Sequence, residues 1–116
     1  MLRDPRAYLW DMRDAASAIQ EFVAGMNSAD YASSVLVQSA VERKFEIIGE
    51  ALAQLAKLDP VLAARVPHLS QIIAFRNQLV HGYAVVKQQT VWNVVQDSLP
   101  PLVDQVHALL LEIGEV

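Results

Sequence analysis

The feature that most restricts the fold is a stretch from residue 29 to Leu58 that contains one glycine and no proline. Its apolar residues recur at helical spacing and not in the alternation of a strand: Val35, Leu36, Ala40, Val41, Phe45, Ile48, Leu52 and Leu55. Three residues at its start can cap a helix: Asn27, Ser28 and Asp30. Asp59-Pro60 ends the pattern. We therefore predict one long helix, against which the other segments pack.

The segments on either side of this helix are also predicted to be helical. Asp4-Pro5 can begin a first helix, because aspartate caps and proline is tolerated at the first helical position. Gly25 is a suitable stop for it. A connector runs from Pro60 to Pro67 with one helical turn through Leu62 to Arg65, and a third helix is predicted to begin at Pro67 or Ser70.

A fourth helix is predicted to begin near Gln88 or Gln89. Pro100-Pro101 should kink or break it, because two backbone donors are missing there. The chain of 116 residues is 53% hydrophobic with four glycines, and no repeat or linker divides it. We predict a single all-α domain over residues 1–116, folded as a helical bundle.

Composition excludes several classes of protein and function. The chain has no cysteine and three scattered histidines, so a thiolate or histidine metal cluster is not expected. No apolar run reaches the roughly 20 residues of a membrane span, and the N-terminal segment lacks a signal-peptide core. We therefore expect a cytosolic protein that needs no metal and no cofactor. A net charge of −4 argues against a broad nucleic-acid footprint, and DNA binding is not expected.

The segment Arg76 to Tyr83, RNQLVHGY, is the one place where a cation, an amide, an imidazole and a phenol fall within eight residues. Gly82 is expected to end the third helix, which places His81 at its C-terminus. There the helix dipole favours an imidazolium ion, and a histidine poised near neutral pH suits proton transfer. Asn77 lies four residues before His81 and can hydrogen-bond to it. The Tyr83 hydroxyl is expected to face solvent.

Glu46 and Glu50 lie on one face of the long helix, on either side of Gly49. A glycine in mid-helix costs about 1 kcal/mol relative to alanine, so Gly49 is expected to allow another backbone to come close. One hypothesis is that Glu46 or Glu50 meets Arg76. The other is that the two carboxylates form a solvated acidic edge.

These residue types suit metal-free cleavage of RNA. A histidine can move a proton at the 2′-hydroxyl or the leaving oxygen, and arginine offers a planar charged fork for phosphate oxygens. Arg76 lies about 140° round an ideal helix from His81, so both meet one phosphate only if the chain unwinds at Gly82. Two copies across a two-fold axis would supply a second base and a second cation. The alternative is that Arg76 and His81 only stabilise a helix end.

RNQLVHGY resembles the Arg-x4-His-x-Tyr signature of HepT-like toxins, a branch of the HEPN superfamily. The similarity extends to AVERKFEIIGEALAQL, VPHLSQIIAFRNQLVHGY and TVWNVVQDSLPPL, in the order of that family. One departure is Pro67-His68, where the family often has tryptophan after the proline. The resemblance thus covers most of the chain.

The resemblance implies a HEPN-type up-and-down bundle of four to five helices that forms a homodimer. It implies a metal-independent endoribonuclease, the toxin of a toxin–antitoxin pair whose antitoxin is a minimal nucleotidyltransferase. Arg76 and His81 would be the catalytic pair, with Asn77 and Glu50 in support. Tyr83 would be the residue that the antitoxin modifies with AMP. A non-catalytic dimeric subunit that binds a nucleotidyltransferase is the alternative, and it predicts complex formation without nuclease activity.

Overall fold

The computed structural model describes residues 3–82 and 86–114. Within these ranges the chain has no strand and seven α-helices, which are α1 (Pro5–Phe22), α2 (Ser28–Ala32), α3 (Val35–Leu58), α4 (Pro60–Ala63), α5 (Leu69–His81), α6 (Gln88–Asp97) and α7 (Leu99–Glu112). The two short helices, α2 and α4, have five and four residues, and each of the others has at least ten. The prediction of an all-α bundle with up to five main helices is confirmed.

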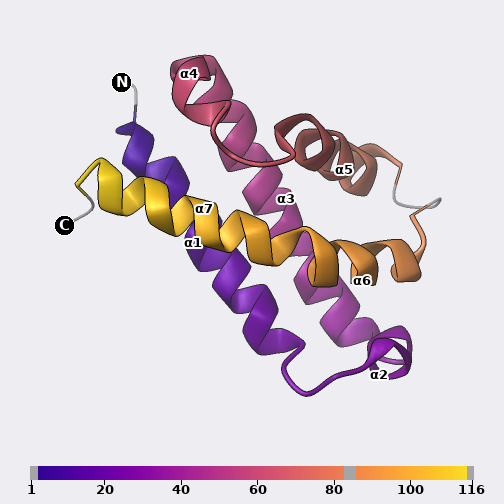
Figure 1. Ribbon diagram of the computed structural model, residues 1–116. Helices are drawn as coiled ribbons and strands as arrows, with labels where there is room; N and C mark the ends of the chain where they lie inside the picture. Colours follow the sequence, from indigo (N-terminus) through magenta and orange to yellow (C-terminus); the bar gives the residue numbers. More distant parts are fainter. Residues whose placement is uncertain (1–2, 83–85, 115–116) are drawn as a thin grey trace.

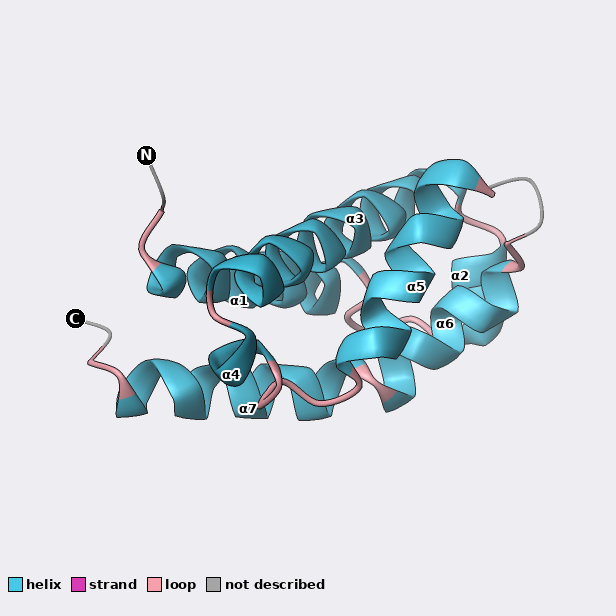
Figure 2. Cartoon of the chain, turned by 90° about the horizontal axis from the view of Figure 1, so that it is seen from above, coloured by secondary structure: helices cyan, strands magenta, loops and turns pink. Residues whose placement is uncertain are grey.

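The long helix α3 organises the bundle. It runs antiparallel to α1 and packs against it, and α5 packs against another side of α3 (Figure 1). Helices α6 and α7 follow one another end to end and change direction at their junction (Figure 2). Helix α7 covers α1, and α6 reaches the short α2. The two proposed functional segments, on α3 and α5, are therefore direct neighbours.

The core lies between α1, α3, α6 and α7, and these helices supply most of its side chains. Fully buried members include Leu9, Met12, Ile19, Ile48, Leu52, Leu55, Leu99, Leu109 and Leu110. Helix α5 differs from them, because Leu79 is its only buried residue. This helix therefore lies on the surface of the bundle, where most of its side chains remain accessible.

Local signals set the ends of α1 as predicted. The Asp4 carboxylate accepts a hydrogen bond from the Arg6 backbone N–H at 2.9 Å, and Pro5 is the first helical residue. Hydrogen bonds from the Arg6 side chain and backbone hold the pKa of Asp4 at about 2. The helix ends at Phe22, and Gly25 follows in the left-handed conformation with φ 78°.

The prediction of one helix from residue 29 to Leu58 is wrong, because the chain breaks at Ser33–Ser34. The Ser34 hydroxyl accepts a hydrogen bond from the Val37 N–H at 3.2 Å and begins α3. The Gln38 amide donates to two carbonyl oxygens at the end of α2, at 3.0 Å each. The apolar residues that indicated the helix all lie in α3, from Val35 on, and the earlier start rested on the capping residues alone, so the pattern did not reveal the break.

We expect Ser34→Ala to destabilise the protein by about 1 kcal/mol, since alanine leaves an N–H of α3 without its cap. Urea unfolding measures this change. Ser39→Ala is the matched control, because Ser39 is exposed in the interior of the same helix. Equal stability of the two variants would contradict the capping role of Ser34.

The starts of the later helices agree with the prediction in most cases but not in all. Helix α5 begins at Leu69, not at Pro67 or Ser70, and its N-cap is His68 in the left-handed conformation with φ 59°. The connector forms its helical turn at Pro60–Ala63, two residues earlier than predicted, because Asp59 caps it there. Helix α6 begins at Gln88 as predicted, and α7 begins at Leu99, so both prolines stand in its first turn. Proline is tolerated there because the first N–H groups of a helix have no partner within it.

Among the helices of the described ranges, none combines the length and the apolarity that a membrane span requires.

Candidate functional site

Arg76 stands where α5 comes closest to α3. A methyl group at Gly49 would overlap the Cβ of Arg76 and lie 2.5 Å from its Cγ. Only glycine at this position of α3 therefore lets the stem of Arg76 lie directly against the helix. The prediction that Gly49 allows close approach of another backbone is confirmed.

The guanidinium of Arg76 is held by two hydrogen bonds. Its Nη2 donates to Glu50 Oε2 at 2.6 Å, and its Nη1 donates to Asn77 Oδ1 at 2.9 Å. The pairing of Arg76 with one of the two glutamates of α3 is thus confirmed, and the partner is Glu50. The Nε of Arg76 is buried without a hydrogen-bond partner in the described part of the chain.

Two hydrogens of the guanidinium remain for a ligand, one on each Nη, because each Nη carries two and donates one to the protein. The side chain of Arg76 is 25% exposed. Its fork is therefore fixed in direction and still reachable from solvent, an arrangement that suits bidentate binding of a phosphate.

A cavity of about 300 Å³ opens beside this fork, between α1, α3 and α5. It is lined by three arginines and three carboxylates: Arg3, Asp11, Arg43, Glu46, Glu50 and Arg76. Arg43 shares the cavity with Arg76, whereas Lys44 and Lys87 do not line it. Sequence reasoning missed the contribution of α1, because nothing local in residues 3–11 indicates which part of α3 they meet.

His81 is the last residue of α5, and Gly82 caps the helix as predicted. Its side chain is exposed and has no hydrogen bond or ion pair with the described residues. The helix continues through His81, so Arg76 and His81 stay on different sides of it. The expected hydrogen bond between Asn77 and His81 is not formed, and Asn77 accepts one from Arg76 instead.

The structure therefore brings Glu50, Arg76 and Asn77 together and leaves His81 apart from them within one chain. Tyr83 lies outside the described residues. In the described part of the chain no three histidine or acidic side chains gather in a way that could hold a metal ion.

Fold and site together define a small all-α protein with a clamped arginine and a helix-terminal histidine on one surface helix. The chain belongs to the ribonuclease HepT-like family, whose model matches residues 12–109.

Several relatives are similar over almost their whole length. A Thermococcus cleftensis protein named "Probable ribonuclease HepT" is 30% identical over 102 residues, which cover 88% of this chain and 92% of that protein. The Caldanaerobacter subterraneus subsp. tengcongensis protein named "Putative RNase TTE0752" is 29% identical, with 94% of this chain and 96% of that protein covered. No solved structure is similar enough to count as a match.

Proposed function

We propose that this protein is a metal-independent endoribonuclease, with Arg76 and His81 as its catalytic pair. The observation that carries the proposal is the clamped fork of Arg76, held by Glu50 and Asn77 in a chain of the ribonuclease HepT-like family. A guanidinium fixed in this way needs little reorganisation to stabilise the charge that builds on a phosphate.

The proposed reaction cleaves the RNA backbone by internal transfer. The 2′-oxygen forms a bond to phosphorus, and the bond from phosphorus to the 5′-oxygen breaks. His81 takes the proton of the 2′-hydroxyl as general base, and the leaving 5′-oxygen takes up a proton from a general acid. Arg76 binds the non-bridging oxygens through its two free Nη hydrogens. The products are a 2′,3′-cyclic phosphate and a 5′-hydroxyl.

A homodimer accounts for the separation of Arg76 and His81 on α5. In one chain their side chains leave the helix about 140° apart. A second copy across a two-fold axis would place another histidine and another arginine at the same cleft, which supplies both a base and an acid. We therefore propose that the active form is a dimer.

We further propose that the protein is the toxin of a toxin–antitoxin pair, silenced by a minimal nucleotidyltransferase. The Tyr83 hydroxyl would attack the α-phosphorus of ATP, and pyrophosphate would leave. The AMP group would add bulk and negative charge two residues from His81, which would repel an RNA phosphate. The basis for this proposal is the sequence of residues 76–83.

The proposed function is tested by RNA cleavage with purified protein in excess chelator, after intact mass has shown that Tyr83 carries no adduct. Cleavage should continue, with cyclic phosphate ends. Absence of cleavage on both tRNA and mRNA would favour the non-catalytic subunit that binds a nucleotidyltransferase.

Glu50 is expected to act as a positioning residue for Arg76. We expect Glu50→Gln to lower kcat between roughly ten- and a hundred-fold, because the fork loses its charged partner and turns. The melting temperature should stay nearly constant, since half-exposed ion pairs contribute little to stability. Glu21→Gln is the matched control, because Glu21 is an exposed glutamate of α1 that does not line the cavity. A similar kcat for both variants would show that Glu50 has no such role.

A further inference from the structure

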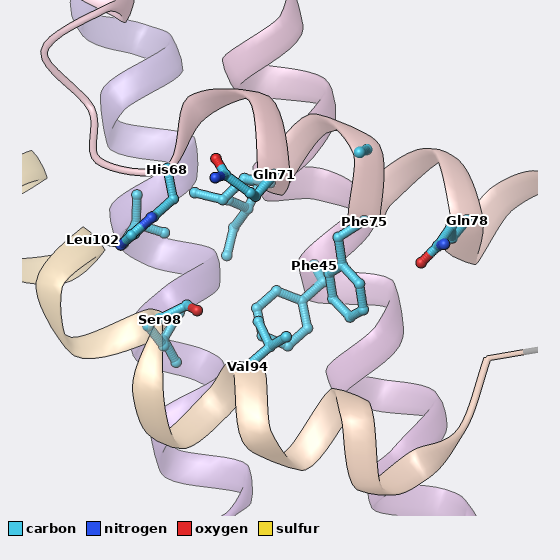
Figure 3. Close-up of a pocket in the computed structure, with 12 residues that line it drawn as sticks. Phe45, His68, Gln71, Phe75, Gln78, Val94, Ser98 and Leu102 are labelled. Carbon is cyan, nitrogen blue, oxygen red and sulfur yellow. The ribbon is translucent and has the colours of Figure 1, made fainter.

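A second cavity, of about 370 Å³, lies on the other side of α5, between α3, α5 and the junction of α6 and α7. Its walls are mostly apolar, with Phe45, Ile72, Phe75 and Leu102 among them, and a few polar side chains stand at its rim. Figure 3 shows Phe45 and Phe75 at the centre of the cavity, with Gln71 to one side and Gln78 to the other. Small-molecule sites in proteins commonly have this size and composition.

The aromatic wall offers a stacking surface. The rings of Phe45 and Phe75 meet edge to face, with centroids 5.3 Å apart and planes at 79°. Phe45 is buried, whereas Phe75 is only partly covered. Each nucleobase has a π face, so an accessible phenylalanine can stack on any of the four.

Two glutamine amides line the same cavity from α5. Gln71 and Gln78 are both exposed, and neither side chain has a hydrogen-bond partner among the described residues. A free amide presents a donor and an acceptor side by side, which matches the polar edge of a base. The cavity thus combines a stacking wall with unpaired groups that can recognise the edge of a base.

The cavity reaches the last turn of α5 at Gln78. Ala74 and Gln78 both line it, and on α5 they lie seven and three residues before His81. Ala74 and His81 therefore point within about 20° of each other, and Gln78 is one turn from His81, about 4.5 Å along the axis. Arg76 faces the opposite, charged cavity. Phe75 points about 120° from His81 around the helix, so His81 lies beyond the edge of the apolar cavity, at the end of α5 nearest Gln78.

We propose that this cavity binds a nucleobase of single-stranded RNA next to the cleaved phosphate. Phe75 stacks on the base, and the Gln78 amide forms hydrogen bonds with the polar edge of the base. This inference rests on the proposed ribonuclease function and adds a subsite that sets the preferred sequence. A base in the cavity places its sugar and phosphate at the end of α5, where His81 stands.

The test measures fluorescence anisotropy with labelled 2′-O-methyl RNAs about eight nucleotides long, composed of A, C or U alone. The methyl group blocks attack by the 2′-oxygen, so binding is measured without cleavage. Phe75→Leu keeps the apolar volume and removes the π face, and it should weaken binding of all three about ten-fold. Gln78→Ala should reduce the difference in affinity among the three RNAs, because the hydrogen bonds from the Gln78 amide to the base edge are lost.

Two matched controls lie on α1, outside the cavity. Phe22→Leu and Gln20→Ala change exposed residues of the same types and should leave both affinity and preference unchanged. Gel filtration of each variant shows whether its oligomeric state is preserved.

The inference would be overturned if both cavity variants keep the RNA affinity and the base preference of the wild type. The ribonuclease proposal would still stand in that case, provided that the wild-type protein cleaves RNA and His81→Ala does not. RNA affinity lost in Phe75→Leu, with no cleavage by wild-type protein, would uphold the subsite and refute the nuclease. A changed oligomeric state in Phe75→Leu with normal RNA binding would assign the cavity to a protein contact and overturn the inference. Failure of wild-type protein to bind any of the RNAs would overturn it too.

Discussion

His81→Ala is expected to lower the rate of RNA cleavage by roughly 10² to 10⁴, the usual contribution of a general acid or base. The fold should be unaffected, because the His81 side chain is exposed and makes no hydrogen bond with the described residues. A time course of cleavage on a labelled RNA, beside a thermal melt of the same sample, separates the two effects.

The matched control for this variant is His107→Ala. His107 is an exposed histidine on α7, away from both cavities. Its removal should leave cleavage at the wild-type rate. Full activity in His81→Ala with an intact fold would refute the proposed chemistry, whereas equal losses in both variants would point to a general effect of removing surface imidazoles.

Gly49→Ala is expected to have a large effect on both stability and activity. Two contributions oppose each other. Alanine is favoured over glycine in a helix by about 1 kcal/mol. Its methyl group, however, would overlap the Cβ of Arg76 and lie 2.5 Å from the Cγ, so the backbones of α3 and α5 must separate. Overpacking of this kind typically costs about 1–3 kcal/mol.

We expect the steric cost to prevail, because the atom that overlaps is a Cβ bound to the α5 backbone and cannot rotate away. The melting temperature should fall by about 4–8 °C for each kcal/mol of net loss. Cleavage should fall roughly a hundred-fold, since Arg76 shifts relative to the bound phosphate. Thermal unfolding and the cleavage assay measure the two effects.

A double-mutant cycle with Arg76→Gly shows whether the clash is the cause. Arg76→Gly removes the two atoms that lie too close to the new methyl, and the Cα that remains is at an ordinary contact distance of 3.6 Å. In that background Gly49→Ala should be neutral or stabilising, which gives a coupling energy of about 1 kcal/mol or more. A destabilisation that stays the same in both backgrounds would mean that Gly49 is required for some reason other than the approach of Arg76.

The outline of the fold was readable from the sequence because helix ends depend on neighbours in the chain. Asp4-Pro5 began α1, Gly82 ended α5, and Pro100-Pro101 separated α6 from α7. Each of these signals acts within one helical turn. The break at Ser33–Ser34 was missed because serine is also common inside helices, and only the bonds made by Ser34 and Gln38 show that the chain turns there.

By itself the sequence determined the all-helical class, the helix that carries Arg76 and His81, and the need for glycine at position 49, because caps, prolines and helical periodicity act locally. Only the tertiary structure decided that Glu50, and not Glu46, holds Arg76, because those residues lie on different helices and their distance depends on how α5 packs on α3. The same packing decided that one face of α5 meets a charged cavity and the other an aromatic one. Such contacts join residues far apart in the chain, and no local pattern of residues specifies them.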